Sequence, residues 1–200
     1  MMAVPGLTAK NLTKHLVDVC EARADAMAVI DIENVYTPFT ENTDSFQSNV
    51  GTVASAISSL RTRDMNSSYA ATYYPWVQIK DPNTSKLLWV PPSVAAIGTY
   101  ASAEAKSELW FAPAGFTRGG LTEGAAGLSV VNVTEQVVRK DRDKLYTANI
   151  NPIASFPAEG IVIFGQKTLQ VTPSALDRIN VRRLLIYVKK EVSRMAATIL

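Results

Sequence analysis

The sequence predicts an α/β (or α+β) fold in which a mixed sheet of buried strands is flanked by amphipathic helices. Two short, mostly apolar runs, 26–32 and 160–165, have the length and composition of strands covered on both faces. Several other segments repeat apolar residues at helical spacing. With 47% hydrophobic and 19% charged residues among 200, the chain can bury a core, so we expect a single domain or core fragment over 1–200.

The first half of the chain reads as helix, strand and helix. A helix is expected to begin after Thr8, which can cap it. Its apolar stripe would consist of Leu12, Leu16, Val19 and Cys20. The buried strand 26–32 follows. After the polar stretch 37–49, the spacing of apolar residues in 50–63 predicts a second helix.

A β-hairpin is expected around 69–90. Segments 69–80 and 86–90 are rich in aromatic and β-branched residues, and the residues between them, 81–85, have the composition of a turn. Two prolines then stop the second strand, because proline lacks a backbone donor. Ser93 can cap a helix that runs toward Lys106.

The second half begins with a loop-rich segment at 110–130, which contains five glycines between 110 and 127. A charged, solvated helix is expected to open at 134–136 and to reach about Tyr146, before the buried strand 160–165. Asn180 can cap the last helix. The apolar stripe of that helix comprises Val181, Leu185, Val188, Val192, Met195 and Ile199. We expect this stripe to face the core. Leu185→Ala should then lower the free energy of unfolding by about 2 to 5 kcal/mol.

Composition argues against several classes of protein. The formal charge of +2 is too small to indicate a nucleic-acid groove or an anionic membrane as partner. The lone Cys20 and lone His15 argue against an internal disulfide and against a Cys/His metal site. No apolar run reaches the length of a membrane span, and no signal-type segment begins the chain. We therefore expect a soluble, non-secreted protein in a cytosolic redox setting.

Two stretches are candidates for chemistry. Asp31 and Glu33 end the first buried strand, as metal-binding or ribose-binding acids do in α/β enzymes, so an enzyme with a site near Asp31 and Glu33 is one alternative. No phosphate-binding glycine motif follows them, and solvated strand-end acids are the simpler interpretation. The stretch 115–121, with Arg118, is a candidate anion loop but matches no known motif. Catalytic, cofactor and metal residues are expected to be absent, and the chain not to be an enzyme.

Six ordered segments resemble the tail sheath proteins of contractile phages. They are CEARADAMAVIDI (20–32), SSYAATYYPWVQIKDP (67–82), WVPPSVAAIGTYA (89–101), WFAPAGFTRGGL (110–121), NINPIASFPAEGIVIFGQKTLQ (149–170) and INVRRLLIYVKKEVSR (179–194). The resemblance covers roughly residues 12 to 200. It implies a fragment that lacks the C-terminal, tube-facing region and most of the N-terminal region of such proteins. The doubled Met1–Met2 start agrees with a partial gene product.

The resemblance implies a structural subunit without a cofactor. Such subunits polymerise into a helical tube around the tail tube and contract to drive genome delivery. The implied partners are other sheath subunits, the tail tube protein and baseplate or tail terminator proteins, in a virion assembled in the host cytoplasm. Charged segments 139–144 and 182–190 become candidate intersubunit patches, although a merely solvated surface explains them equally well. The fragment alone is expected to be monomeric. The sheath of a contractile bacteriocin or secretion system is the nearer alternative.

Overall fold

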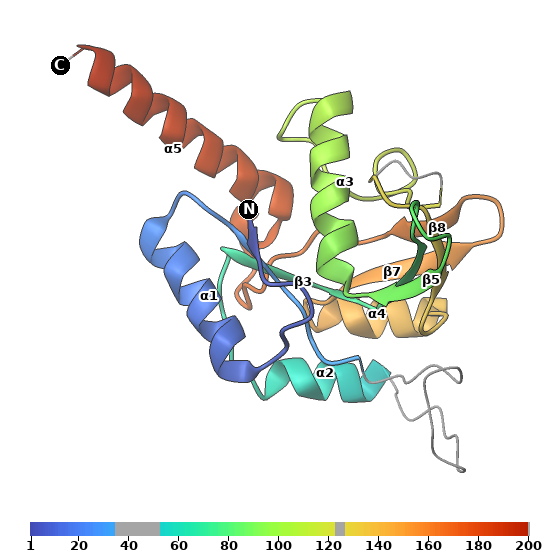
Figure 1. Ribbon diagram of the computed structural model, residues 1–200. Coiled ribbons are helices and arrows are strands. Elements are labelled where there is room, and N and C mark those ends of the chain that lie inside the picture. The colour runs from blue at the N-terminus through green and yellow to red at the C-terminus, as the bar shows by residue number, and fades with distance from the viewer. Residues whose placement is uncertain (35–52, 123–126, 200) are drawn as a thin grey trace.

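The computed structural model describes residues 1–34, 53–122 and 127–199 (Figure 1). The predicted loop 37–49 lies outside these ranges, as do the first residues of the helix expected over 50–63 and residues 123–126 of the loop-rich segment 110–130. In chain order the elements are β1 (Met2–Ala3), α1 (Lys10–Arg23), β2 (Ala28–Ile30), α2 (Val53–Arg61), β3 (Ala70–Tyr74), β4 (Val77–Lys80), β5 (Leu87–Val90), α3 (Pro92–Lys106), β6 (Val130–Val133), α4 (Arg139–Thr147), β7 (Asn151–Phe156), β8 (Gly160–Ile163), the short 3-10 helix η1 (Ala175–Asp177) and α5 (Ile179–Ile199).

A five-stranded mixed sheet forms the centre of the molecule, in the order β1-β2-β3-β7-β8. The first four strands are parallel, and β8 runs antiparallel to β7. Alternate side chains point to opposite faces of a strand. Val29, Ala71 and Ile153 join the core cluster that includes residues of α3, whereas Ala28, Ile30 and Ala70 join the cluster that includes residues of α1 and α2. The predicted α/β class and both predicted buried strands are confirmed.

A second, antiparallel sheet has the order β5-β4-β6. The predicted hairpin is confirmed for β4 and β5, where Val77 lies opposite Val90 and Lys80 opposite Leu87. The prediction of one strand over 69–80 is wrong, because β3 belongs to the central sheet and β4 to the small one. Pro75, which follows Tyr74 through a cis peptide bond, separates them, and its missing N–H interrupts the ladder.

Several helix ends differ from prediction. Helix α1 begins at Lys10, with Ala9 rather than Thr8 at the cap position. Its buried residues are Thr13, Val17 and Cys20, so the predicted stripe is rotated and Leu12 is exposed. Helix α3 has Pro91 at the cap position, and Ser93 lies inside the first turn.

Helix α4 begins at Arg139, later than the predicted start at 134–136. The N–H of Thr134 donates instead to the carbonyl oxygen of Trp76, directly after strand β6. Strands β1, β6 and β7 have no counterpart in the sequence prediction. Pro152 and the polar residues Asn151 and Ser155 conceal β7, because they break the apolar pattern of a central strand.

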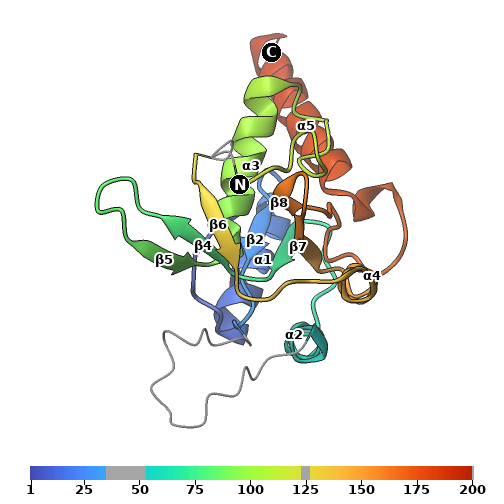
Figure 2. The same ribbon diagram turned by 90° about the vertical axis from the view of Figure 1, so that its right-hand side faces the viewer.

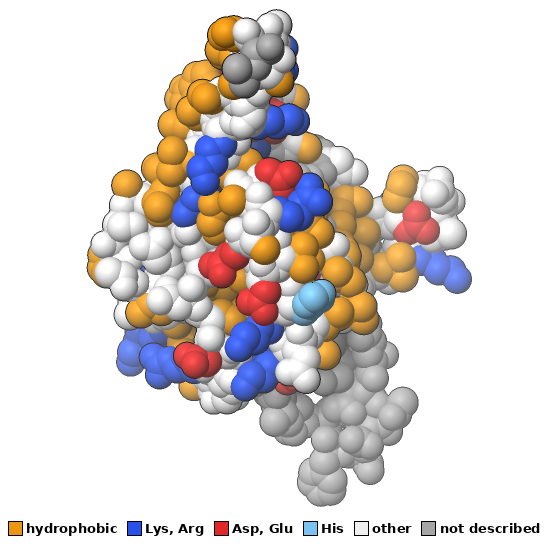
Figure 3. Space-filling model, turned by 90° about the vertical axis from the view of Figure 1, so that its left-hand side faces the viewer, with side chains coloured by type: hydrophobic (Ala, Val, Ile, Leu, Met, Phe, Trp, Pro, Cys, Tyr) orange, Lys and Arg blue, Asp and Glu red, His pale blue; other side chains and the backbone are white. Residues whose placement is uncertain are grey.

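Helix α5 leaves the body of the molecule and extends away from it (Figures 1 and 2). Only Ile179, Arg182 and Arg183 of this helix are buried. The prediction that its apolar stripe faces the core is therefore wrong: exposure rises from 37% at Leu185 to 85% at Ile199. Hydrophobic side chains follow one side of the helix almost to its end (Figure 3). In the described part of the chain, no helix is long and apolar enough to cross a membrane.

Candidate assembly surfaces

Asp31 lies at the end of β2 and is buried. Its carboxylate accepts hydrogen bonds from the N–H of Gly6 (3.0 Å) and from the N–H (3.0 Å) and hydroxyl (2.7 Å) of Ser93. Burial raises the pKa of the Asp31 carboxyl, and the hydrogen bonds from Ser93 and Gly6 offset part of that rise. Asp31 thus ties the sheet to the first turn of α3, and its interpretation as a solvated acid is wrong.

The other candidate groups for chemistry lie apart. Glu33 is exposed, as expected for a strand-end acid, and contributes an electrostatic interaction to Arg63. Cys20 is fully buried, its thiol pKa is raised by burial, and its sulfur lies 3.6 Å from that of Met2. His15 is exposed. Among the described residues, no three His, Cys, Asp or Glu side chains gather in a way that could hold a metal ion.

The glycine-rich loop 115–121 uses its backbone donors inside the protein. The N–H of Gly115 donates to Ile163 (2.8 Å), and that of Leu121 donates to Ile161 (2.8 Å). A Cβ at Gly119 would lie 2.5 Å from the carbonyl oxygen of Ile163, so only glycine fits this close approach to β8. The loop is therefore held against the end of the sheet through Gly115, Gly119 and Leu121.

Two buried arginines fasten the base of α5. The guanidinium of Arg182 lies over the Tyr69 ring, 4.0 Å from its centroid, and donates to the hydroxyl of Ser68. Arg183 pairs with Glu104 of α3 at 3.0 Å. The expected charged patch over 182–190 is therefore divided: both arginines are buried, whereas Lys189 and Lys190 are exposed.

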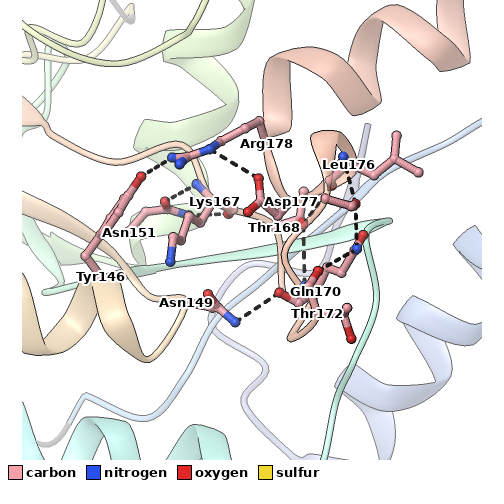
Figure 4. Close-up of polar contacts among 11 residues, drawn as sticks. Tyr146, Asn149, Asn151, Lys167, Thr168, Gln170, Thr172, Leu176, Asp177 and Arg178 are labelled. Atoms are coloured by element: carbon pink, nitrogen blue, oxygen red, sulfur yellow. Dashed lines mark hydrogen bonds and ion pairs between the residues drawn. The ribbon is translucent and has the colours of Figure 1, made fainter.

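A polar network holds the segment that leads into α5 (Figure 4). The side chain of Asn151 in β7 donates to the carbonyl oxygens of Thr72 (3.0 Å) and Lys167 (2.8 Å) and accepts from the N–H of Lys167 (2.6 Å). Arg178 donates to the hydroxyl of Tyr146 in α4 and pairs with Asp177 at 3.2 Å. These contacts fix the direction in which α5 leaves the sheet.

The second predicted patch, 139–144 on α4, is indeed at the surface. Lys144 pairs with Asp141 across one turn at 2.9 Å. Arg142 is half-buried, with its guanidinium over the ring of Phe156. This patch and the apolar side of α5 are two separate exposed surfaces, each of a kind suited to contacts with other proteins.

Two phage proteins are similar to this chain in sequence. The tail sheath protein of Enterobacteria phage T4 is 31% identical over 194 residues, which cover 94% of this chain and 28% of that protein. The tail sheath protein of Vibrio phage KVP40 is 41% identical over 108 residues, covering 54% of this chain and 15% of that protein. The chain is a homologue of phage tail sheath proteins. It spans less than a third of the length of these relatives.

The fold agrees with this homology. In the contracted helical sheath of the anti-feeding prophage, a chain 22% identical aligns with a TM-score of 0.65, over 98% of this chain and 46% of that one. At that identity the likeness is one of fold. No protein-family model matches the sequence.

The residues that organise these surfaces were not found from the sequence. Asn151, Tyr146 and Arg178 lie in three separate segments, and nothing in their spacing brings them together. One feature of the sequence could have indicated that Arg182 and Arg183 are buried. They lie close to the start of the helix, on a different side from its apolar stripe. Arginines in such positions are nevertheless expected to be exposed to solvent, because arginine is seldom fully buried.

Proposed function

We propose that the chain is part of a structural, non-enzymatic subunit of a contractile phage tail sheath. The similarity to phage T4 tail sheath protein over 94% of the chain carries this proposal. In it, residues 1–200 act as one unit of a virion protein assembled in the host cytoplasm. The subunits polymerise around the tail tube and contract to drive genome delivery, with the tail tube, baseplate and tail terminator proteins as further partners.

The architecture supports a mechanical role. A sheet buried on both faces resists deformation, because close-packed interiors transmit strain rather than absorb it. The buried arginines and the Asn151 network hold the base of α5 rigidly to this sheet. Contraction then consists of rigid-body repacking of subunits, with the energy stored in their contacts. The exposed apolar side of α5 is a surface that the assembled sheath has to cover.

Assembly gives the test. Residues 1–200 alone should sediment as a monomer, because exposed ion pairs contribute only about 0 to 1 kcal/mol each, too little to offset the entropy lost on association. The sheath subunit that carries this sequence should form tubes visible by negative-stain microscopy. Ordered tubes from residues 1–200 alone would refute the expected monomer, and a complete subunit that never polymerises would refute the proposed function.

The sheath of a contractile bacteriocin or secretion system is the second candidate. The likeness of fold to the sheath of the anti-feeding prophage supports it. The two candidates differ in their gene neighbourhood, since capsid and portal genes accompany only a phage. Sequencing the genes beside this one separates them.

A further inference from the structure

An aromatic cluster lies at the surface between the glycine-rich loop and the end of the central sheet. The rings of Phe116, Phe156 and Phe164 pack together, with centroids 5.0 to 5.4 Å apart. Phe116 and Phe164 are nevertheless 50% and 41% exposed. Large, rigid side chains that are only half covered are typical of protein interfaces.

Arg142 of α4 lies on this cluster. Its guanidinium is 4.8 Å from the centroid of Phe156 and 5.7 Å from that of Phe164. Among the residues that the structure describes, the side chains of Arg142 and Arg139 form no hydrogen bond or ion pair. The guanidinium of Arg142 is therefore held in a fixed plane by the rings, while its donors remain available to an acceptor from outside.

A groove of about 500 Å³ adjoins the cluster. Its lining residues include Arg139, Arg142 and Tyr146 of α4, together with Arg178 and Phe164. Asp143 is the single acidic residue among its lining side chains. Arg178 already has partners in Tyr146 and Asp177 (Figure 4). Arg139 and Arg142, which have no ion-pair partner among the described residues, therefore give the groove its positive character.

We infer that this groove binds an acidic, partly apolar segment of a neighbouring sheath subunit. Carboxylates match the planar fork of an arginine by two parallel hydrogen bonds, and an apolar side chain covers the exposed rings. A duplex or single-stranded nucleic acid fits less well, because the chain as a whole carries a charge of only +2. A pocket on one subunit that takes a segment of the next is a heterologous contact, which propagates a helical tube. The identity of the partner rests on the proposed function.

Binding can be measured on residues 1–200 with two probe peptides of twelve residues. One contains four glutamates, two leucines and a phenylalanine, and the other replaces each glutamate by glutamine. In amide-shift titrations the glutamate peptide should perturb α4 and the Phe164 region, and should bind at least about tenfold more tightly than the glutamine peptide. Raising the salt concentration should weaken the binding of the glutamate peptide.

The variants test the geometry. Arg142→Ala should lower the affinity for the glutamate peptide about tenfold. Arg142→Lys should restore little of that affinity, because lysine offers neither the planar fork of donors nor the flat stacking surface of arginine. Arg194→Ala, an exposed arginine of α5, is the matched control and should change nothing. Thermal melting confirms that each variant folds. Equal binding of both peptides, or equal effects of Arg142→Ala and Arg194→Ala, would overturn the inference.

A second measurement separates this inference from the proposed function. In the complete sheath subunit, Arg142→Glu should reduce tube formation strongly, whereas Arg23→Glu, at an exposed arginine that ends α1, should not. If the unchanged subunit forms no tubes, the proposed function fails. If it forms tubes and Arg142→Glu forms them equally well, the sheath role stands and the groove is not an intersubunit site.

Discussion

The first turn of α5 and its later turns contain similar residues but have opposite environments. At the base, Ile179 is fully buried and two arginines are covered by tyrosine rings. Ile186 still packs against the core, whereas Tyr187, Val188 and the apolar residues after them are exposed. Helical periodicity is the same in both parts, so it reports which residues share a face and not what that face contacts. The base belongs to the folded unit, and the outer turns are available for assembly.

The comparison predicts its largest effect at Ile179. Ile179→Ala removes a side chain from the core cluster that also contains Ile153 and Ile163. The loss of buried methyl groups and the remaining cavity should lower the free energy of unfolding by about 2 to 5 kcal/mol. Urea denaturation followed by circular dichroism measures it. A cost below about 1 kcal/mol would mean that the base of α5 is not part of the cooperative unit.

The buried strands were predictable because coverage on both faces leaves a continuous apolar run in the sequence. That pattern is local, so it can be recognised without knowledge of the rest of the fold. The strand within 26–32 is an example. The hairpin was only half predictable: the turn at 81–85 is local, but the transfer of the chain from one sheet to another at Pro75 depends on distant strands. Asn151 was missed for the same reason, since its partners lie 16 and 79 residues away.

A second, smaller effect is expected at Asp31, which attaches the first turn of α3 to the sheet as the buried arginines attach the base of α5. Asp31→Asn weakens hydrogen bonds to a buried carboxylate and should cost roughly 1 to 3 kcal/mol. Because burial raises the pKa of Asp31, the folded protein binds the proton more tightly than the unfolded chain. The contribution of this proton to stability is fully present below the unfolded pKa of about 4, and it is lost as the pH rises through the raised pKa.

Asp31→Asn should therefore lower the free energy of unfolding more at pH 4 than at pH 7, as measured by urea denaturation across that range. Asp81 in the hairpin turn is the matched control. A hydrogen bond from Thr84 and another from the N–H of Asn83 lower the pKa of Asp81, so its contribution has the opposite sign and is lost as the pH falls. Parallel pH trends for Asp31→Asn and Asp81→Asn would contradict the assigned environment of Asp31.

The smallest effect is expected on the outer part of α5. Leu185 is 37% exposed in spite of its place in the centre of the apolar stripe, so Leu185→Ala creates no closed cavity. It should change the free energy of unfolding of residues 1–200 by less than about 1 kcal/mol, close to the effect of Lys189→Ala on the same helix. The sequence alone had predicted a cost several times larger, because it assumed that an apolar stripe packs on the core of its own domain.

Paired denaturation curves of Leu185→Ala and Lys189→Ala measure this difference directly. If Leu185→Ala costs 2 kcal/mol or more while Lys189→Ala costs nothing, the outer turns of α5 fold back onto the body in solution. Nearly equal, small effects would leave the stripe free in the isolated chain. The same Leu185→Ala change in the complete sheath subunit should then impair tube formation far more than Lys189→Ala, because only there is the apolar side of the helix covered.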